Sequence, residues 1–173
     1  QKALVTLDKV LEQDETFGIG MNGEISAVTF GLYAQEDITA ADGSVIPADG
    51  LQEIVSVNEN GQAVCSTDLP FGSFYLKELS TDSHYLLNGK TFPFTFEYGG
   101  PSVAVVEISA NDGEAVTNEL IRGEIKGLKT DENGTGLGGA VIGLFKSDET
   151  EFTAENALAT TTSADDGSFS FTN

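Results

Sequence analysis

Three polar residues stand out because each interrupts the apolar face of a strand-like segment. Side chains of a β-strand alternate between its two faces, and in residues 3–11 this alternation puts Lys9 on the same face as valine and leucine side chains. The same counting puts Glu78 and Asn118 on the apolar faces of two later segments. We therefore expect a lysine, a glutamate and an asparagine to point toward one core.

These three residue types can together make a covalent bond. An unpaired charge in a protein core costs several kcal/mol, which favours the neutral forms of a buried lysine and a buried glutamate. A neutral amine can attack an asparagine carbonyl that a protonated glutamate polarises, and it then expels ammonia. We expect an isopeptide bond of this kind between Lys9 and Asn118, with Glu78 assisting. The alternative is structural: Lys9 reaches the rim of the fold and Asn118 caps a turn.

The sequence supplies a regular series of short strands to hold these side chains. Valine, threonine, phenylalanine and tyrosine recur between turn signals such as Asn60-Gly61 and Asn88-Gly89. No stretch has a sustained helical period, so we predict an all-β fold, an antiparallel β-sandwich with almost no helix. The expected strands are residues 3–11, 26–34, 52–57, 62–67, 73–79, 92–98, 102–109 and 115–120.

The later part of the chain repeats motifs of the earlier part. Phe-Gly-Leu-Tyr at residues 30–33 is echoed by Ile-Gly-Leu-Phe at residues 142–145. The turn and strand at residues 58–64 are echoed at residues 164–170. Self-similarity of this kind indicates two copies of one structural unit in tandem.

The repeat predicts a complete domain in residues 1–121 and the N-terminal part of a second in residues 122–173. The boundary at residues 120–123 leaves almost no linker, so we expect the two domains to abut. Lys129 is the counterpart of Lys9 in the truncated copy. The matching glutamate and asparagine would lie beyond the sequence, so we expect Lys129 to have no isopeptide partner in this chain. The strands beside it should then have unpaired edges.

The order lysine, glutamate, asparagine on a first, a middle and a last strand resembles the isopeptide triad of collagen-adhesin B-type domains. These are the prealbumin-like modules of Gram-positive pilins and surface adhesins. The resemblance covers residues 2–121 fully and residues 122–173 partly, although the turn that follows Glu78 keeps only the tyrosine of the family pattern, Tyr85. The matching motifs are Val5-Thr6-Leu7-Asp8-Lys9, Val28-Thr29-Phe30-Gly31-Leu32, Leu69-Pro70-Phe71-Gly72-Ser73-Phe74-Tyr75-Leu76-Lys77-Glu78 and Val116-Thr117-Asn118.

The resemblance implies a structural role outside the cell. The chain would be a stalk or backbone module of a secreted, cell-wall-anchored pilin or adhesin, and it would be rigidified by the bond between Lys9 and Asn118. Its partners would be neighbouring domains of the same surface protein. The bond would form once, by autocatalysis without turnover, so we do not expect an enzyme.

Two other functions stay open. The module could be the ligand-binding part of an adhesin that recognises a host extracellular protein or glycan, which a concave aromatic patch would support. Phe92, Phe94, Phe96 and Tyr98 alternate onto one face, but a core strand gives the same pattern. The module could also be a spacer in a secreted, wall-anchored hydrolase.

Composition argues against other classes of function. The chain has 28 acidic and 8 basic residues, a net charge of −20, which disfavours binding to nucleic acid and direct contact with an anionic membrane. Clustered histidine and cysteine for a zinc site are absent, and the calcium-like run that starts at Asp131 has Ile142 at its twelfth position instead of an acid. We expect no cofactor. His84, the single histidine, sits in a turn and gives little support to a Ser-His-Asp triad.

The single cysteine, Cys65, rules out an intrachain disulfide bond. It alternates with Ala63 in an apolar strand, so we expect it to be buried and unreactive in the folded protein.

Overall fold

A computed structural model describes residues 1–172 and divides into two compact units, Gln1–Ile121 and a second that begins at Arg122. Nearly all of its regular structure is β, which confirms the predicted all-β class. The two helical segments of the described chain are single 3₁₀ turns, η1 (Glu24–Ala27) and η2 (Ala110–Gly113). No helix in residues 1–172 is long and apolar enough to cross a membrane.

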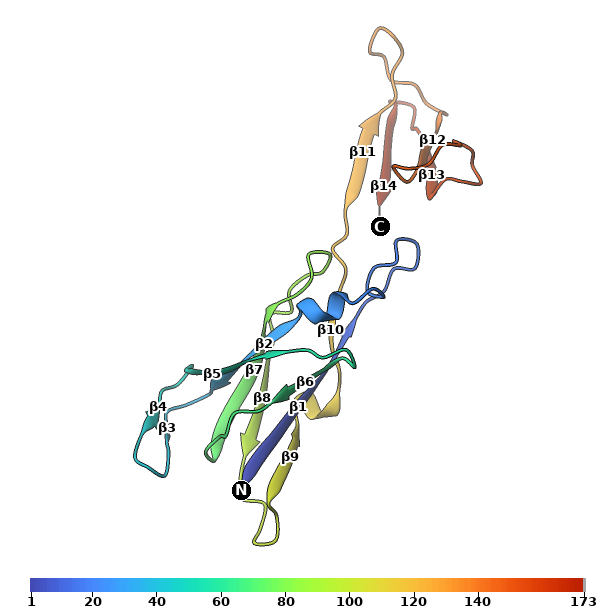
Figure 1. Ribbon diagram of the computed structural model, residues 1–173. Helices are drawn as coiled ribbons and strands as arrows, with labels where there is room; N and C mark the ends of the chain where they lie inside the picture. Colours follow the sequence, from blue (N-terminus) through green and yellow to red (C-terminus); the bar gives the residue numbers. More distant parts are fainter. Residues whose placement is uncertain (173) are drawn as a thin grey trace. The chain divides into compact units, whose positions relative to one another are not determined.

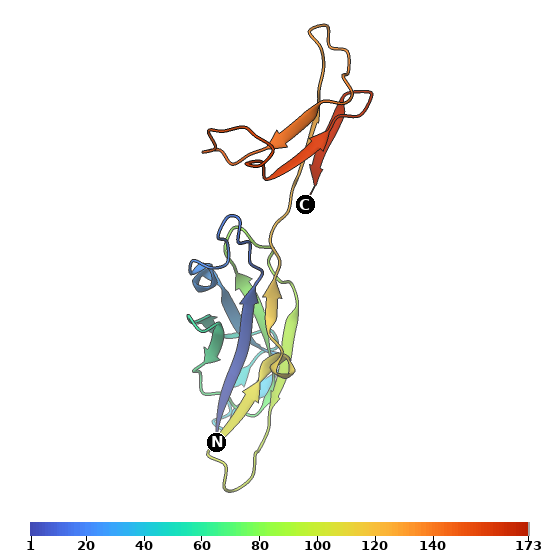
Figure 2. The ribbon, with the colours of Figure 1, turned by 90° about the vertical axis from the view of Figure 1, so that its right-hand side faces the viewer.

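The first unit is a sandwich of two sheets (Figure 1). In one sheet the central strand has an antiparallel partner on one side. On its other side it has two parallel partners, which follow each other in the sequence and lie end to end beside it (Figure 2). Its strands are β1 (Lys2–Leu11) at the centre, β6 (Gln62–Cys65), β9 (Val105–Ser109) and β10 (Val116–Asn118). The other sheet is antiparallel, in the order β5 (Leu51–Ser56), β2 (Thr29–Ala34), β7 (Gly72–Ser80) and β8 (Thr91–Phe96).

Alternating side chains from both sheets fill the space between them. Val5, Leu7 and Leu11 of β1 are buried, as the period of two requires. Aromatic residues dominate the facing sheet, where the rings of Phe74 and Phe94 stack with centroids 5.7 Å apart. Burial of large aromatic side chains is the main stabilising contribution in such a core.

Three details differ from the predicted strands. Residues 24–27 form η1 instead of starting a strand, because they have no partner strand and bury none of their side chains. A short hairpin of β3 (Ile38–Thr39) and β4 (Val45–Ile46) was not predicted. Tyr98, expected on the face of the buried Phe92, Phe94 and Phe96, lies beyond the end of β8 and is 62% exposed.

The second unit has the same pairing as part of the first. Two antiparallel pairs are present: β11 (Glu124–Leu128) with β14 (Ser168–Thr172), and β12 (Val141–Leu144) with β13 (Ala159–Thr162). The likeness extends to single hydrogen bonds. The N–H of Lys9 donates to the carbonyl of Gly61 at 2.7 Å, and the N–H of Lys129 donates to that of Gly167 at 2.7 Å. The pair β11–β14 therefore corresponds to β1–β6, and the pair β12–β13 to β2–β5.

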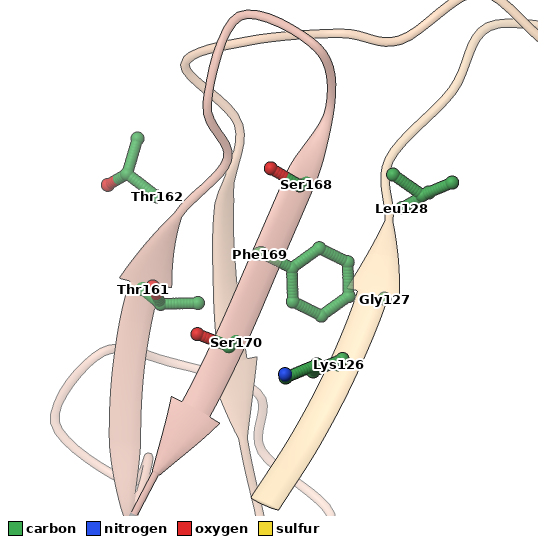
Figure 3. Close-up of a pocket in the computed structure, with 8 residues that line it drawn as sticks. All are labelled: Lys126, Gly127, Leu128, Thr161, Thr162, Ser168, Phe169 and Ser170. Atoms are coloured by element: carbon green, nitrogen blue, oxygen red, sulfur yellow. The ribbon is translucent and has the colours of Figure 1, made fainter.

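The core side of the second unit is open. Within the described residues it has no counterparts of β7 to β10, and a groove of about 760 Å³ runs along β11, β13 and β14. Figure 3 shows the ring of Phe169 beside Gly127 in this groove. In the first unit, β7 and β10 are present and their inward side chains are buried.

Candidate functional site

Lys9, Glu78 and Asn118 meet inside the first unit. Within this unit they are its buried polar residues, with 3%, 1% and 1% of their surface exposed. The parallel pairing of β1 with β10 sets Lys9 opposite Val116 and Leu11 opposite Asn118, so Lys9 and Asn118 are diagonal neighbours on the inward face. Glu78 points at them from β7 of the facing sheet, on the same face as Phe74 and Leu76.

The carboxylate of Glu78 lies between the two nitrogen atoms. Its Oε1 is 3.9 Å from the Nζ of Lys9. Its Oε2 accepts a hydrogen bond of 2.7 Å from the Nδ2 of Asn118, whose second hydrogen bond goes to the carbonyl of Leu86 at 2.8 Å. The Nζ of Lys9 also donates to the carbonyls of Val10 and Val116, at 2.9 and 3.0 Å. One carboxyl group therefore faces both the amine and the amide nitrogen.

Two oxygen atoms of this cluster are not satisfied. Glu78 Oε1 and Asn118 Oδ1 are buried and accept no hydrogen bond from the described residues. A buried acceptor without a donor costs about 1–3 kcal/mol, more if it is charged. The sequence led us to expect the acid at the amide oxygen, but in the structure the acid contacts the amide nitrogen. The arrangement is therefore costly as a purely structural ion pair.

The position of Lys9 changes its protonation. Burial lowers its pKa from 10.5 to about 8, and the negative charge of Glu78 opposes this shift. Roughly a tenth of the amine is then neutral at pH 7, against a few parts in ten thousand for an exposed lysine. The core thus holds a usable fraction of Lys9 in its nucleophilic form.

Lys129 lies in a different environment. It follows the end of β11 and is exposed, and its Nζ donates to the carbonyl of Thr130 at 3.1 Å, as that of Lys9 does to Val10. No acid or amide side chain is placed against it by the hydrogen bonds and ion pairs of the described residues. The structure therefore gives Lys129 the backbone position of Lys9 without its reacting partners.

The remaining candidates have structural roles. Cys65 is buried, as predicted, and burial followed by the charge of Glu53 raises its pKa to about 12. His84 pairs with Asp82 at 2.6 Å in an exposed turn. Asp131 accepts backbone hydrogen bonds inside its own turn, and no group of three or more potential metal ligands occurs in residues 1–172.

Sequence reasoning missed two contributors to the site, both in the segment between β7 and β8. They are the carbonyl of Leu86, which contacts Asn118, and the N–H of Asn88, which donates to Glu78 Oε2 at 2.7 Å. Both are backbone groups, which every residue type provides, so no sequence signal marks them.

Comparison with known proteins identifies the family. A family model described as the SpaA prealbumin-like fold domain matches residues 19–111, more than half of the chain. No curated protein matches. Among solved structures, the Bacillus anthracis TIE protein is 18% identical with a TM-score of 0.58, over 98% of this chain and 26% of that one.

Two pilins are also similar, with lower TM-scores. The major pilin subunit BcpA of Bacillus cereus is 17% identical with a TM-score of 0.42, over 73% of this chain and 31% of the pilin. A streptococcal ancillary pilin is 18% identical with a TM-score of 0.41, over 99% of this chain and 50% of the pilin. The chain thus spans from a quarter to a half of these structures. On the family match, the chain belongs to the SpaA prealbumin-like fold domain family.

Proposed function

We propose that the first unit is a structural module of a Gram-positive surface pilin or adhesin, and that it closes its own core with an isopeptide bond between Lys9 and Asn118. One observation carries the proposal: the buried polar residues of this core are one amine, one amide and one acid, and the acid contacts both of the others.

The reaction needs no group from outside the site. Glu78 takes a proton from Lys9 through Oε1, which leaves a neutral amine and a neutral acid. The Nζ of Lys9 then attacks the Cγ of Asn118, and the C=O bond opens to a tetrahedral intermediate. Protonated Glu78 then gives up this proton to the Nδ2 of Asn118, the nitrogen that its carboxyl group contacts, and Nδ2 leaves as ammonia when the C–N bond breaks. The attacking nitrogen loses its extra proton to Glu78, which ends as a neutral carboxylic acid, and stays bound as an amide.

The energetics favour the reaction product over the unreacted trio. The product has no charge on Lys9, so the desolvation cost of a buried ammonium disappears. The new bond also closes a loop of about 110 residues, worth roughly 4–5 kcal/mol by analogy with disulfide bonds. Because the bond forms once and the site does not turn over, we propose a structural protein and not an enzyme.

The wider role follows from the family. The likeness to a major pilin subunit and to an ancillary pilin supports a module in an extracellular, wall-anchored assembly, whose partners are neighbouring domains and other subunits of that assembly. The second unit, by the correspondence of its strand pairs, is the beginning of another such module.

Intact-mass spectrometry tests the bond directly. The folded chain should weigh about 17 Da less than its sequence, the mass of one ammonia molecule. Only one such deficit is expected, because no acid or amide side chain of residues 1–172 is paired with Lys129. Digestion should give a branched peptide that joins Lys9 to Asn118.

The variant Glu78→Gln serves as a matched control, because it keeps the shape of the side chain and removes the acid. It should have the full mass and a lower free energy of unfolding. A full mass for the folded wild-type chain would exclude the isopeptide bond and leave the buried trio as a structural feature.

A further inference from the structure

We infer that the segment between β7 and β8, residues 81–90, positions the reacting groups, with the backbone N–H of Asn88 and the carbonyl of Leu86 as the two groups that orient acid and amide. This inference rests on the proposed isopeptide reaction and adds to it the segment that orients the groups between which protons are transferred.

The segment is firmly attached although it lies outside both sheets. Tyr85 forms a β-bridge with Leu120, and the N–H of Leu86 donates to the carbonyl of Glu119 at 2.9 Å. The side chain of Tyr85 is 3% exposed, and its hydroxyl donates to the carbonyl of Glu12 at 2.7 Å. These contacts tie the segment to the residues that follow Asn118 and to the end of β1.

Two backbone groups of the segment then contact the site. The N–H of Asn88 donates to Glu78 Oε2 at 2.7 Å, and the carbonyl of Leu86 accepts from Asn118 Nδ2 at 2.8 Å. The side chain of Leu86 is exposed, so its carbonyl is the part of this residue that acts at the site.

These contacts determine which atoms of Glu78 and Asn118 face each other. Both hydrogens of the Asn118 amide are engaged, one by Glu78 Oε2 and one by the carbonyl of Leu86. If the amide turned over while Glu78 is a carboxylate, its oxygen would face two acceptors, so before proton transfer the leaving nitrogen is held against Glu78. Oε2 receives a second donor from Asn88, which holds this oxygen on the leaving nitrogen and keeps Oε1 directed at Lys9.

The contribution is geometric, so it should affect the rate of the reaction and not which residues react. An acid that can rotate, or an amide that can turn over, spends only part of its time aligned for proton transfer. Loss of alignment by about 1 Å can slow a reaction on the order of a hundredfold.

The experiment measures how fast ammonia is lost on folding. The chain is purified unfolded in urea, its full mass is verified, and it is refolded by dilution; the fraction lighter by about 17 Da is followed with time. In Asn88→Pro the N–H donor is absent. In Asn88→Ala the N–H stays, whereas the side-chain bonds to the carbonyl of Thr117 and from the N–H of Lys90 are lost.

We expect Asn88→Ala and Leu86→Ala to react within about threefold of the wild-type rate, and Asn88→Pro to react at least about tenfold more slowly. If proline prevents folding, an ester in place of the amide between Leu87 and residue 88 removes the same N–H without the ring, and the same slowing is expected. An ester variant that reacts at the wild-type rate overturns the inference.

The pH dependence separates positioning from loosening of the core. If the variant has lost only the positioning, its reaction rate falls at every pH. The midpoint of the plot of rate against pH then stays near 8, the pKa that burial gives Lys9. If the variant only admits water to the core, the midpoint moves toward 10.5, and the positioning role is refuted. Two failures can be told apart. A wild-type chain that never loses ammonia would refute the isopeptide bond itself. A wild-type chain and an ester variant that react equally fast would refute only the positioning role of the Asn88 N–H.

Discussion

A variant that cannot form the bond should become more stable as pH rises. In Asn118→Ala, Lys9 stays a free amine in the core beside Glu78. Its pKa is about 8 in the folded chain and 10.5 in the unfolded chain. Between these values the unfolded chain binds more protons than the folded one, so the free energy of unfolding rises with pH. Well below pH 8 both states carry the charged amine, and this contribution is constant.

The size of the effect follows from the two pKa values. One pKa unit corresponds to about 1.4 kcal/mol, and most of the interval between 8 and 10.5 has been crossed at pH 10. The contribution of Lys9 should therefore add about 2.5 kcal/mol to the free energy of unfolding between pH 7 and pH 10. In the wild-type chain Lys9 would be an amide nitrogen that does not titrate, so this increase should be absent.

Urea unfolding of Asn118→Ala at pH 7, 8, 9 and 10 measures the effect, with Lys9→Met in the same background as the control. The control is needed because burial raises the pKa of Cys65 to about 12. A thiol with a raised folded-state pKa loses stability as pH increases, in both variants equally. The difference between the two curves isolates Lys9. Parallel curves from pH 7 to pH 10 would refute the conclusion that the core contains a titrating amine.

Three further outcomes follow from the structure. Exposed Lys129 should be acylated quickly by an amine-reactive ester while Lys9 is not, and peptide mapping that finds Lys9 modified in the native chain would contradict its burial. Cys65 should resist a thiol reagent until denaturant is added, and stoichiometric labelling of the native chain within minutes would show that the strand is accessible. Gly61→Ala should lower the free energy of unfolding by about 1–3 kcal/mol, because Gly61 has a φ of 75° and an added Cβ would lie 2.7 Å from the carbonyl oxygen of Lys9. An unchanged midpoint of urea unfolding would argue against that contact.

The sequence was most informative where alternation and apolarity coincide. In β1 and β7 the face that carries Lys9 or Glu78 is otherwise made of apolar residues, which identifies it as the inward face. The inward faces of the two sheets of a sandwich enclose the same core, so both side chains must enter it. The meeting of these residues with Asn118 could be anticipated on this ground. The hairpin of β3 and β4 could not, because strands of two residues have no period to detect.

The end of β8 and the residues around the site show a second limit. Tyr98 continues the alternation of Phe92, Phe94 and Phe96 in sequence, but the strand ends at Phe96 and the ring is left outside the core. The groups that hold Glu78 and Asn118 belong to the backbone of Leu86 and Asn88, and their contact depends on how the chain folds back from β7. Neither the end of β8 at Phe96 nor these backbone contacts is marked by a residue type or a spacing in the sequence.

The parallel pairing of β1 with β9 and β10 determines how the first unit responds to tension. β1 begins at Lys2 and β10 ends at Asn118, so pulling the two ends of the unit apart slides these strands along each other and loads all their hydrogen bonds together in shear. A covalent link from Lys9 to Asn118 would transfer the load at that point. Tension would enter through Lys2–Lys9 and leave through the residues after Asn118, and everything between Val10 and Thr117 would carry none of it. The unit could then be pulled without unfolding, because the strands after Lys9, which supply most of the core, would lie outside the path of the force.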